Sequence, residues 1–288
     1  MKRPVIFLFA LSILMFACSI STTAMPTAIT IPPSVTAPPP ATLPPVVTVP
    51  PVATLPPVAT LPPVPVTNVT CNELALFLDP ALASGYDCKT IPETSGDGFE
   101  VNPQYTELSL QGYPLSDRFF TPHIDIFPLK RYSELAPDAV NPDVAALQAL
   151  IGGGTVGNSL PLLPIFNAGQ LFHAQYKIIK FTPGSGVRYL TQYAQYFDPI
   201  NNYDMFYSYQ GLTSDGKYWI SAILPTSNPI LPANGNNPPN GQSSEDFGNN
   251  YPTYITDITN QLNAQTGGSF SPTISVLDDL IKSIQIQP

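Results

Sequence analysis

A proline-rich repeat at residues 42–65 limits how much of this 288-residue chain can build a folded core. It reads TLPPVVTVPPVATLPPVATLPPVP, four copies of a unit in which Thr and a branched apolar residue precede Pro-Pro-Val. Paired prolines fix φ, lack N–H donors and push the preceding residue toward extended geometry, which disfavours both helix and sheet. We therefore predict a polyproline II spacer about 75 Å long.

The composition changes sharply after this repeat. No charged residue occurs from position 19 to position 72, whereas the remainder of the chain has ordinary globular composition. We assign residues 18–68 to a Thr/Pro/Val-rich linker and residues 69–288 to a single globular domain. About 220 residues are enough for one domain with a substantial core.

The chain begins with MKRPVIFLFALSILMFACS, which is typical of a secretory leader. Lys2 and Arg3 form the positive segment. Residues 5–16 form an apolar segment that is too short for a membrane span, which needs about 20 residues. We therefore predict that residues 1–17 are a lipoprotein-type signal peptide and that the protein is exported.

Cys18 follows Ala17 at the end of the apolar segment, as in the lipobox of bacterial lipoproteins. Met15 and Phe16 depart from the usual pattern of Leu and a small residue, and ordinary cleavage after Ala24 is the alternative. Lipidation of Cys18 would hold the protein on a membrane stably, because several acyl chains are buried. The expected location is a membrane-anchored lipoprotein that faces the periplasm or the cell exterior.

The other two cysteines, Cys71 and Cys88, form an even pair. An even number suits a disulfide in an oxidising compartment, and two free thiols are the alternative.

Acidic residues outnumber basic ones, 20 to 11, and the formal charge is −9. After the leader with Lys2 and Arg3, basic residues do not cluster beyond Lys130-Arg131. Nucleic-acid binding needs a basic face, so we exclude nucleic acid as a partner.

The centre of the domain carries strand signals. Alternating apolar and polar residues predict strands at 105–113 and 123–129. Two longer segments, 171–197 and 202–225, are predicted to be hairpins. Their turns are expected at 183–186 and at 214–216.

Helices are expected near the middle and at the end of the domain. Asn141 has the character of an N-cap, with Pro142 at the first position of a helix that continues to residue 151. Pro252 and Pro272 are expected at further helix starts. The last helix has one apolar stripe, Ile274, Leu277, Ile281 and Ile284. The fold class is therefore α+β: an antiparallel sheet of about five to seven strands with helices packed on it.

Aromatic residues concentrate in the predicted hairpins. Eight of the 14 tyrosines lie between positions 176 and 218, next to the only tryptophan. Aromatic faces on a sheet receive sugars, lipids or peptide side chains when exposed, whereas buried tyrosines simply fill a core. Both interpretations stay open. The candidate ligand-binding residues are Tyr189, Tyr193, Tyr207, Tyr209 and Trp219.

The sequence contains no motif that identifies a catalytic or metal centre. The stretch GGGTVGNS at 152–159 lacks the Lys of a phosphate-binding loop. His123 and Asp125 share a strand face but lack a third metal ligand. The loop DPINNYD, 198–204, lacks EF-hand spacing and favours a turn held by side-chain hydrogen bonds. We assign no catalytic residue, no metal ligand and no cofactor.

A long segment rich in Asn, Pro and Gly, residues 227–251, has no regular pattern. Loops of this length are either functional or poorly ordered. A lid over the aromatic hairpins and a tolerated insertion are the two interpretations.

The segment GVRYLTQYAQYFDPINNYDMFYSYQGLTSDGKYWISAILP, together with LDDLIKSI near the C-terminus, resembles a group of uncharacterised bacterial secreted lipoproteins with a Pro-rich stalk. This likeness covers most of residues 70–288 and implies no activity. The order of strand, hairpins and closing helix is more distantly similar to PsbP/Mog1-like domains, which implies a topology only.

These features lead to one main hypothesis and two alternatives. The main hypothesis is a lipid-anchored cell-envelope protein that displays a binding domain for a protein, glycan or lipid ligand. The first alternative is an envelope-acting hydrolase with an unrecognised active site. The second is a structural component of a surface assembly.

Overall fold

The computed structural model describes residues 66–96 and 100–287. The predicted signal peptide, Cys18 and residues 18–65 of the predicted linker lie outside the described residues. All described residues fall in one structural unit.

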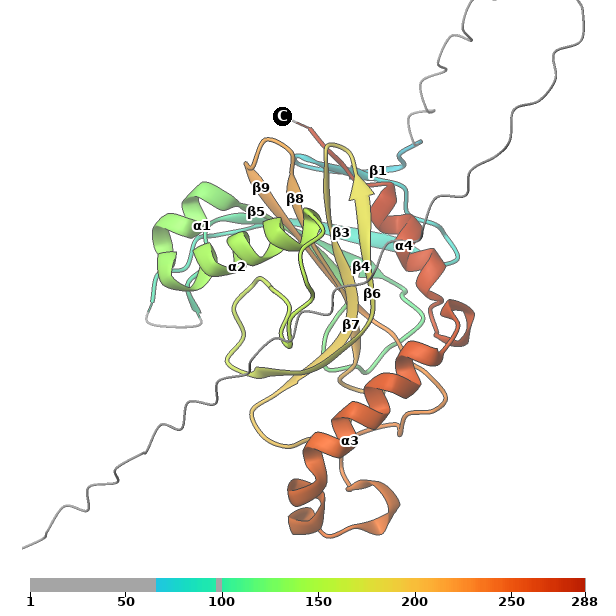
Figure 1. Ribbon diagram of the computed structural model, residues 1–288. Helices are drawn as coiled ribbons and strands as arrows, with labels where there is room; N and C mark the ends of the chain where they lie inside the picture. The colour runs from blue at the N-terminus through green and yellow to red at the C-terminus, as the bar shows by residue number, and fades with distance from the viewer. Residues whose placement is uncertain (1–65, 97–99, 288) are drawn as a thin grey trace, which may run out of the picture. The chain divides into compact units, whose positions relative to one another are not determined.

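A seven-stranded antiparallel sheet forms the centre of the fold, in the order β3-β4-β5-β9-β8-β7-β6 (Figure 1). This confirms the predicted α+β class and the upper end of the predicted strand number. The strands are β3 (Gly85–Ile91), β4 (Tyr105–Gln111), β5 (His123–Pro128), β6 (Gly169–Phe181), β7 (Gly184–Ala194), β8 (Phe206–Thr213) and β9 (Tyr218–Pro225).

The two predicted hairpins are β6–β7 and β8–β9, but the first one turns earlier than expected. Phe181 pairs with Gly184, so the turn lies at residues 182–183 and the following glycines belong to β7. A Cβ atom on Gly184 or Gly186 would collide with a carbonyl oxygen of β8. These glycines therefore allow close approach of the neighbouring strand and do not form the turn.

A second sheet of three short strands has the order β1-β2-β10, with β1 at Val69–Cys71, β2 at Leu74–Leu76 and β10 at Gln285–Ile286. β1 and β2 form a tight hairpin in which Asn72 has a φ of 51°. Asn tolerates this left-handed conformation better than most residues. β10 pairs with β2, so the C-terminal end of the chain joins the beginning of the domain.

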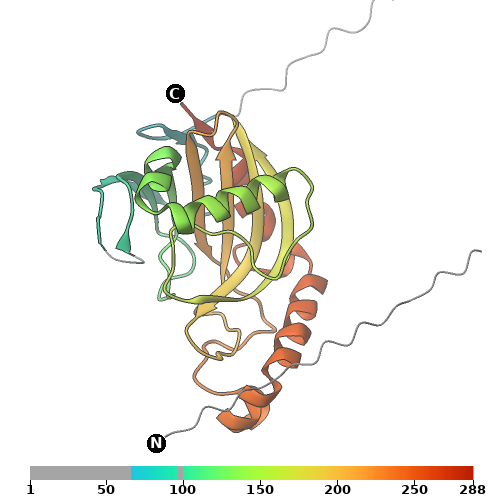
Figure 2. The same cartoon turned by 60° about the vertical axis from the view of Figure 1, so that its left-hand side comes forward.

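Two pairs of helices lie on opposite faces of the large sheet (Figure 2). On one face, α1 (Leu129–Leu135) and α2 (Pro137–Ile151) pack against aromatic side chains of the sheet, among them Phe127 and Trp219. On the other face lie α3 (Ser244–Ala264) and α4 (Ile274–Lys282), together with the small sheet. The predicted apolar stripe is confirmed, because Ile274, Leu277 and Ile281 of α4 are buried, as is Ile284, which lies just beyond the end of the helix.

Two of the predicted helix starts are wrong. α2 begins at Pro137, so Asn141 does not cap it and Pro142 lies inside the helix. α3 begins at Ser244, capped by the Ser243 hydroxyl, which accepts a hydrogen bond from the Asp246 N–H at 3.0 Å. The predicted loop 227–251 therefore ends at residue 243, and Pro252 lies inside α3. Burial of side chains in the first turns outweighs the local proline signal.

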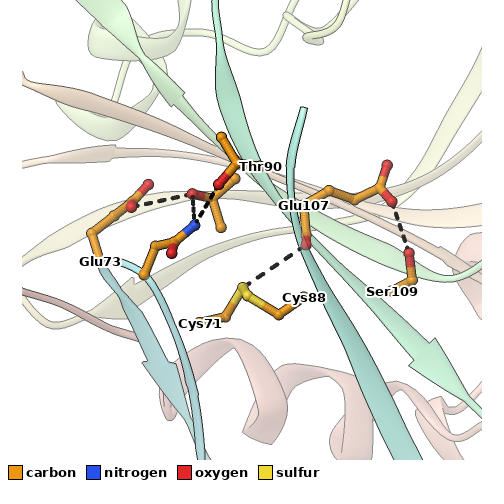
Figure 3. The surroundings of a disulfide bond; sticks show 8 residues. Cys71, Glu73, Cys88, Thr90, Glu107 and Ser109 are labelled. Atoms are coloured by element: carbon orange, nitrogen blue, oxygen red, sulfur yellow. Dashed lines mark hydrogen bonds between the residues drawn. A yellow bond between two sulfur atoms is a disulfide. The ribbon is translucent and has the colours of Figure 1, made fainter. Parts of the chain in front are cut away.

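The predicted disulfide is present between Cys71 and Cys88 (Figure 3). It links β1 of the small sheet to β3 at the edge of the large sheet. Beside it, Asn72 donates hydrogen bonds to Thr90 and Thr106, at 3.1 and 3.0 Å, across the same junction. The covalent bond and these side chains together hold the two sheets against each other.

Replacing Cys71 and Cys88 together by Ala should lower the free energy of unfolding by about 3 kcal/mol, because the bond closes a loop in the unfolded chain. The two positions are 17 residues apart in the sequence. Urea unfolding of both proteins under oxidising conditions measures the difference. An unchanged unfolding midpoint would contradict the expected role of the bond.

Candidate functional site

A cleft of about 380 Å³ opens at one end of the large sheet, where four separate segments of the chain meet. The segments are the loop before β5, the residues before β6, the end of β7 and the connection from β7 to β8. The lining residues are Phe119, Phe120, Phe166, Asn167, Ala168, Tyr193, Ala194, Gln195, Tyr196, Asp198 and Asp204.

The floor of the cleft is a cluster of aromatic rings in mutual contact. Phe120 stacks on Phe166 with a centroid distance of 5.3 Å and an interplanar angle of 14°. Tyr193 meets Phe166 edge to face at 5.2 Å. Phe206 of β8, fully buried, lies edge to face with Phe120 at 4.8 Å. Because these rings support one another and rest on the sheet, the floor is formed before any ligand arrives.

The rim of the cleft exposes aromatic surface to solvent. Phe119 is 63% exposed and Tyr196 is 73% exposed. Phe197 and Tyr203, from the same end of the fold, are also exposed. Scattered exposed apolar residues are common, but a contiguous group around a cavity is typical of an interaction site.

The acidic side of the cleft is built by the turn at residues 198–204. Asn201 is fully buried, and its Oδ1 accepts hydrogen bonds from the N–H groups of Tyr203 and Asp204 at 2.9 and 3.1 Å. Its Nδ2 donates to the carbonyl oxygen of Pro199 at 2.9 Å and to Asp204 Oδ2 at 2.8 Å. These contacts confirm the predicted turn held by side-chain hydrogen bonds.

Asp198 and Asp204 place two carboxylates on this side of the cleft. Gln192 Nε2 donates to Asp198 Oδ2 at 2.7 Å and orients that carboxyl group. Burial, together with the nearby charge of Asp204, raises the pKa of Asp198 to about 6. Both causes disfavour the ionised form of Asp198. No Lys, Arg or His is among the described residues that line the cleft beside these two carboxyl groups.

The long loop 227–243 supports this acidic turn from behind. Asn202 donates from its N–H to the Pro232 carbonyl oxygen at 2.9 Å and from Nδ2 to the Leu231 carbonyl oxygen at 3.0 Å. A Cβ atom on Gly235 would lie 2.6 Å from Asp198 Oδ1. The Tyr251 hydroxyl of α3 donates to the Asp198 carbonyl oxygen at 3.0 Å. The loop and α3 therefore hold the turn in place.

Only Tyr193 among the aromatic residues predicted from the sequence lines the cleft. The other four are fully buried. Their polar atoms are hydrogen bonded inside the protein: the Tyr189 hydroxyl to the Pro161 carbonyl, that of Tyr207 to Asp278, that of Tyr209 to the Ile179 carbonyl, and Trp219 Nε1 to Gln210. These four residues therefore fill the core, which was the second interpretation of the aromatic residues.

Sequence reasoning missed most of the aromatic residues of the cleft. Phe119 and Phe120 are adjacent in a loop, and Tyr196 is the second residue after β7. Neighbouring aromatic residues in a loop do not have the regular spacing that places apolar residues on one face of a helix or strand. The lack of this spacing could have indicated that they are exposed. The partner Phe166 carries no such signal.

His123 and Asp125 lie on the same face of β5, with His123 Nε2 3.6 Å from Asp125 Oδ2. Asp125 is buried, and burial raises its pKa to about 7. Across the described ranges 66–96 and 100–287, no group of three or more His, Cys, Asp or Glu residues is placed to hold a metal ion. In the same ranges no helix has the length and apolarity that a membrane span requires.

The fold and the cleft together define an α+β domain with an aromatic and acidic ligand-sized site. No protein-family model, curated protein or solved structure matches this chain. The cleft is therefore the feature of this protein that indicates a function.

Proposed function

We propose that this protein is an exported, lipid-anchored cell-envelope protein whose α+β domain binds a ligand in the aromatic cleft. The observation that carries the proposal is the cleft itself, with exposed Phe119 and Tyr196 above a floor of packed rings. Its volume of about 380 Å³ lies at the lower end of the range for small-ligand sites, roughly 300–1,000 Å³. A single ring, headgroup or side chain of a glycan, lipid or protein fits that space.

The proposed location rests on the sequence and on the disulfide. The leader, the lipobox-like Cys18 and the proline-rich linker together describe a domain held away from a membrane. The bond between Cys71 and Cys88 agrees with an oxidising compartment. Mass spectrometry of the N-terminal peptide tests the anchor: a diacylglyceryl adduct on Cys18 supports it, and a chain that begins at Met25 excludes it.

A hydrolase that acts on envelope material is the second candidate, and one observation favours it. Asp198, whose pKa is raised to about 6, lies in the same cleft as Asp204. Glycoside hydrolases usually work with a pair of carboxyl groups, one of which has a raised pKa and acts as the acid. However, Asn201 and Gln192 already hold these carboxyl groups in a structural turn. We therefore prefer binding without turnover.

Replacing Phe119 and Tyr196 together by Ser should weaken ligand binding about 10- to 100-fold, because each stacked aromatic contributes about 0.5–1.5 kcal/mol beyond its buried area. The full-length protein is first applied to arrays of envelope glycans, peptides and lipids to find a ligand, and affinity is then measured by calorimetry. Both side chains are largely exposed, so the fold should not change.

The matched control is Tyr86→Ser, because Tyr86 is an exposed aromatic on β3 that does not line the cleft. We expect the control to bind like the parent protein. Equal binding by the double variant would exclude the cleft as the site. Release of a hydrolysed product that stops in Asp198→Asn would establish the hydrolase instead.

A further inference from the structure

The ionisable groups that line the cleft are all acidic. It contains two carboxyl groups, Asp198 and Asp204, and two primary amides, Asn167 and Gln195. Among the described residues that line it, none is Lys, Arg or His. An anionic ligand would be repelled here, and a neutral ligand would leave both carboxylates without a counter-charge.

The two carboxyl groups are held close together by the protein. Asn201 Nδ2 donates to Asp204 Oδ2 at 2.8 Å and lies 3.5 Å from Asp198 Oδ2, so one amide nitrogen contacts both groups. The charge of Asp204 contributes to the raised pKa of Asp198. A positive charge placed in the cleft would relieve this repulsion.

The aromatic residues of the cleft also suit a positively charged ligand. Five aromatic residues line the cleft, and the π faces of such rings attract cations as well as apolar groups. Aromatic rings beside carboxylates form the environment in which organic ammonium groups bind, because their methyl or methylene surface meets the rings while their charge meets the acids.

We propose that the cleft binds a small organic cation that carries a primary or quaternary ammonium group. This inference rests on the proposed function, because it takes the cleft as the ligand site. The aromatic floor receives the carbon surface of the ligand, and Asp198 and Asp204 face its charge.

The test compares charged probes with uncharged probes of the same shape, by calorimetric titration of the full-length protein. The first pair is choline and 3,3-dimethyl-1-butanol, and the second pair is ethanolamine and 1-propanol. We expect at least one charged probe to bind about tenfold more tightly than its uncharged partner, because the charge adds a cation–π and a carboxylate attraction. The advantage should shrink as salt is added.

Two variants examine the carboxyl groups separately. Asp198→Asn and Asp204→Asn each keep an oxygen that accepts the hydrogen bond from Gln192 or Asn201, so the turn is preserved. Each should lower the affinity for the charged probe severalfold and leave the uncharged probe unaffected. Asp257→Asn, an exposed carboxylate of α3 outside this cleft, is the control and should bind like the parent.

The possible results separate the two proposals. Equal affinity for charged and uncharged probes would overturn the proposal of a cationic ligand. The same holds if neither probe binds while a neutral ligand from the arrays occupies the cleft. In both cases the proposal that the cleft binds a ligand would still hold. No binding of any probe or array ligand would overturn both. Near-ultraviolet circular dichroism shows whether each Asn variant folds. If one of them does not, the other variant and the salt dependence still test whether the carboxylates bind the charge of the ligand.

Discussion

Asp278→Ala should lower the free energy of unfolding by about 3–5 kcal/mol, because it leaves a buried guanidinium without its counter-charge. Asp278 of α4 and Arg188 of β7 are both nearly inaccessible to solvent. Arg188 Nε lies 3.1 Å from Asp278 Oδ1, and Arg188 Nη2 lies 3.3 Å from Oδ2. The Tyr207 hydroxyl donates to Oδ1 at 3.0 Å. Lys177 Nζ of β6, partly exposed, lies 3.3 Å from Oδ2. One carboxylate therefore connects α4 to three strands of the sheet, β6, β7 and β8.

Urea unfolding followed by tryptophan fluorescence measures the change, since the only tryptophan, Trp219, lies in the core. The matched control is Asp279→Ala. Asp279 is the next residue on α4, but its side chain is exposed and, among the described residues, forms an ion pair only with Lys282 across one turn. Such surface pairs contribute about 0.2–1 kcal/mol. Similar losses in the two variants would show that the buried pair does not hold α4 on the sheet.

Asp125→Asn should raise stability at pH 8 by about 1–3 kcal/mol and leave it almost unchanged at pH 4, because only the ionised carboxylate is costly to bury. Asp125 is buried in β5, and its Oδ1 has no hydrogen-bond partner among the described residues. Burial is the main cause that raises its pKa to about 7, while His123 opposes the shift.

Proton linkage makes the parent protein less stable as the pH rises. The pKa of Asp125 is higher in the folded protein than in the unfolded chain, so the folded state binds the additional proton between about pH 4 and pH 7. The stability that this proton contributes is complete below pH 4 and is lost as the pH rises through 7. The parent protein should therefore weaken over this range, whereas the Asn variant should not.

Unfolding midpoints at pH 4, 6 and 8 for the parent, for Asp125→Asn and for Asp257→Asn provide the measurement. Asp257 is an exposed carboxylate on α3 and serves as the control. A stability difference between the parent and Asp125→Asn that stays the same at all three pH values would contradict a pH-dependent cost of burial.

Several elements of the fold were predictable from local sequence alone. The stripe Ile274, Leu277, Ile281 and Ile284 has helical spacing, and the alternation in residues 105–113 has strand spacing, so each pattern determines which face is buried. The Cys71–Cys88 pair followed from the even number of remaining cysteines. In these cases the signal lies within one helix or strand, or in the number of cysteines.

Other features were decided only by tertiary contacts. Pro142 and Pro252 suggested helix starts, yet each lies inside a longer helix whose first turns are held by packing. In α3, Phe247 and Tyr251 are buried before the proline and lie edge to face at 5.4 Å. Packing of such aromatic residues contributes more free energy than a local start signal. The boundary therefore could not be predicted from the residues around the proline.

The sequence by itself determined the α+β class, the strand pattern of the hairpins, the disulfide and the concentration of aromatic residues. It did not determine which aromatic residues face a ligand. Tyr193 lines the cleft, whereas Tyr189, on the same face of β7, is fully buried and donates to the Pro161 carbonyl oxygen of the segment before β6. The floor also needs Phe120 and Phe166, which are far apart in the chain. Which side chains are exposed, and which of them lie next to one another, depends on how distant segments pack. Only the tertiary structure therefore shows which residues line the cleft.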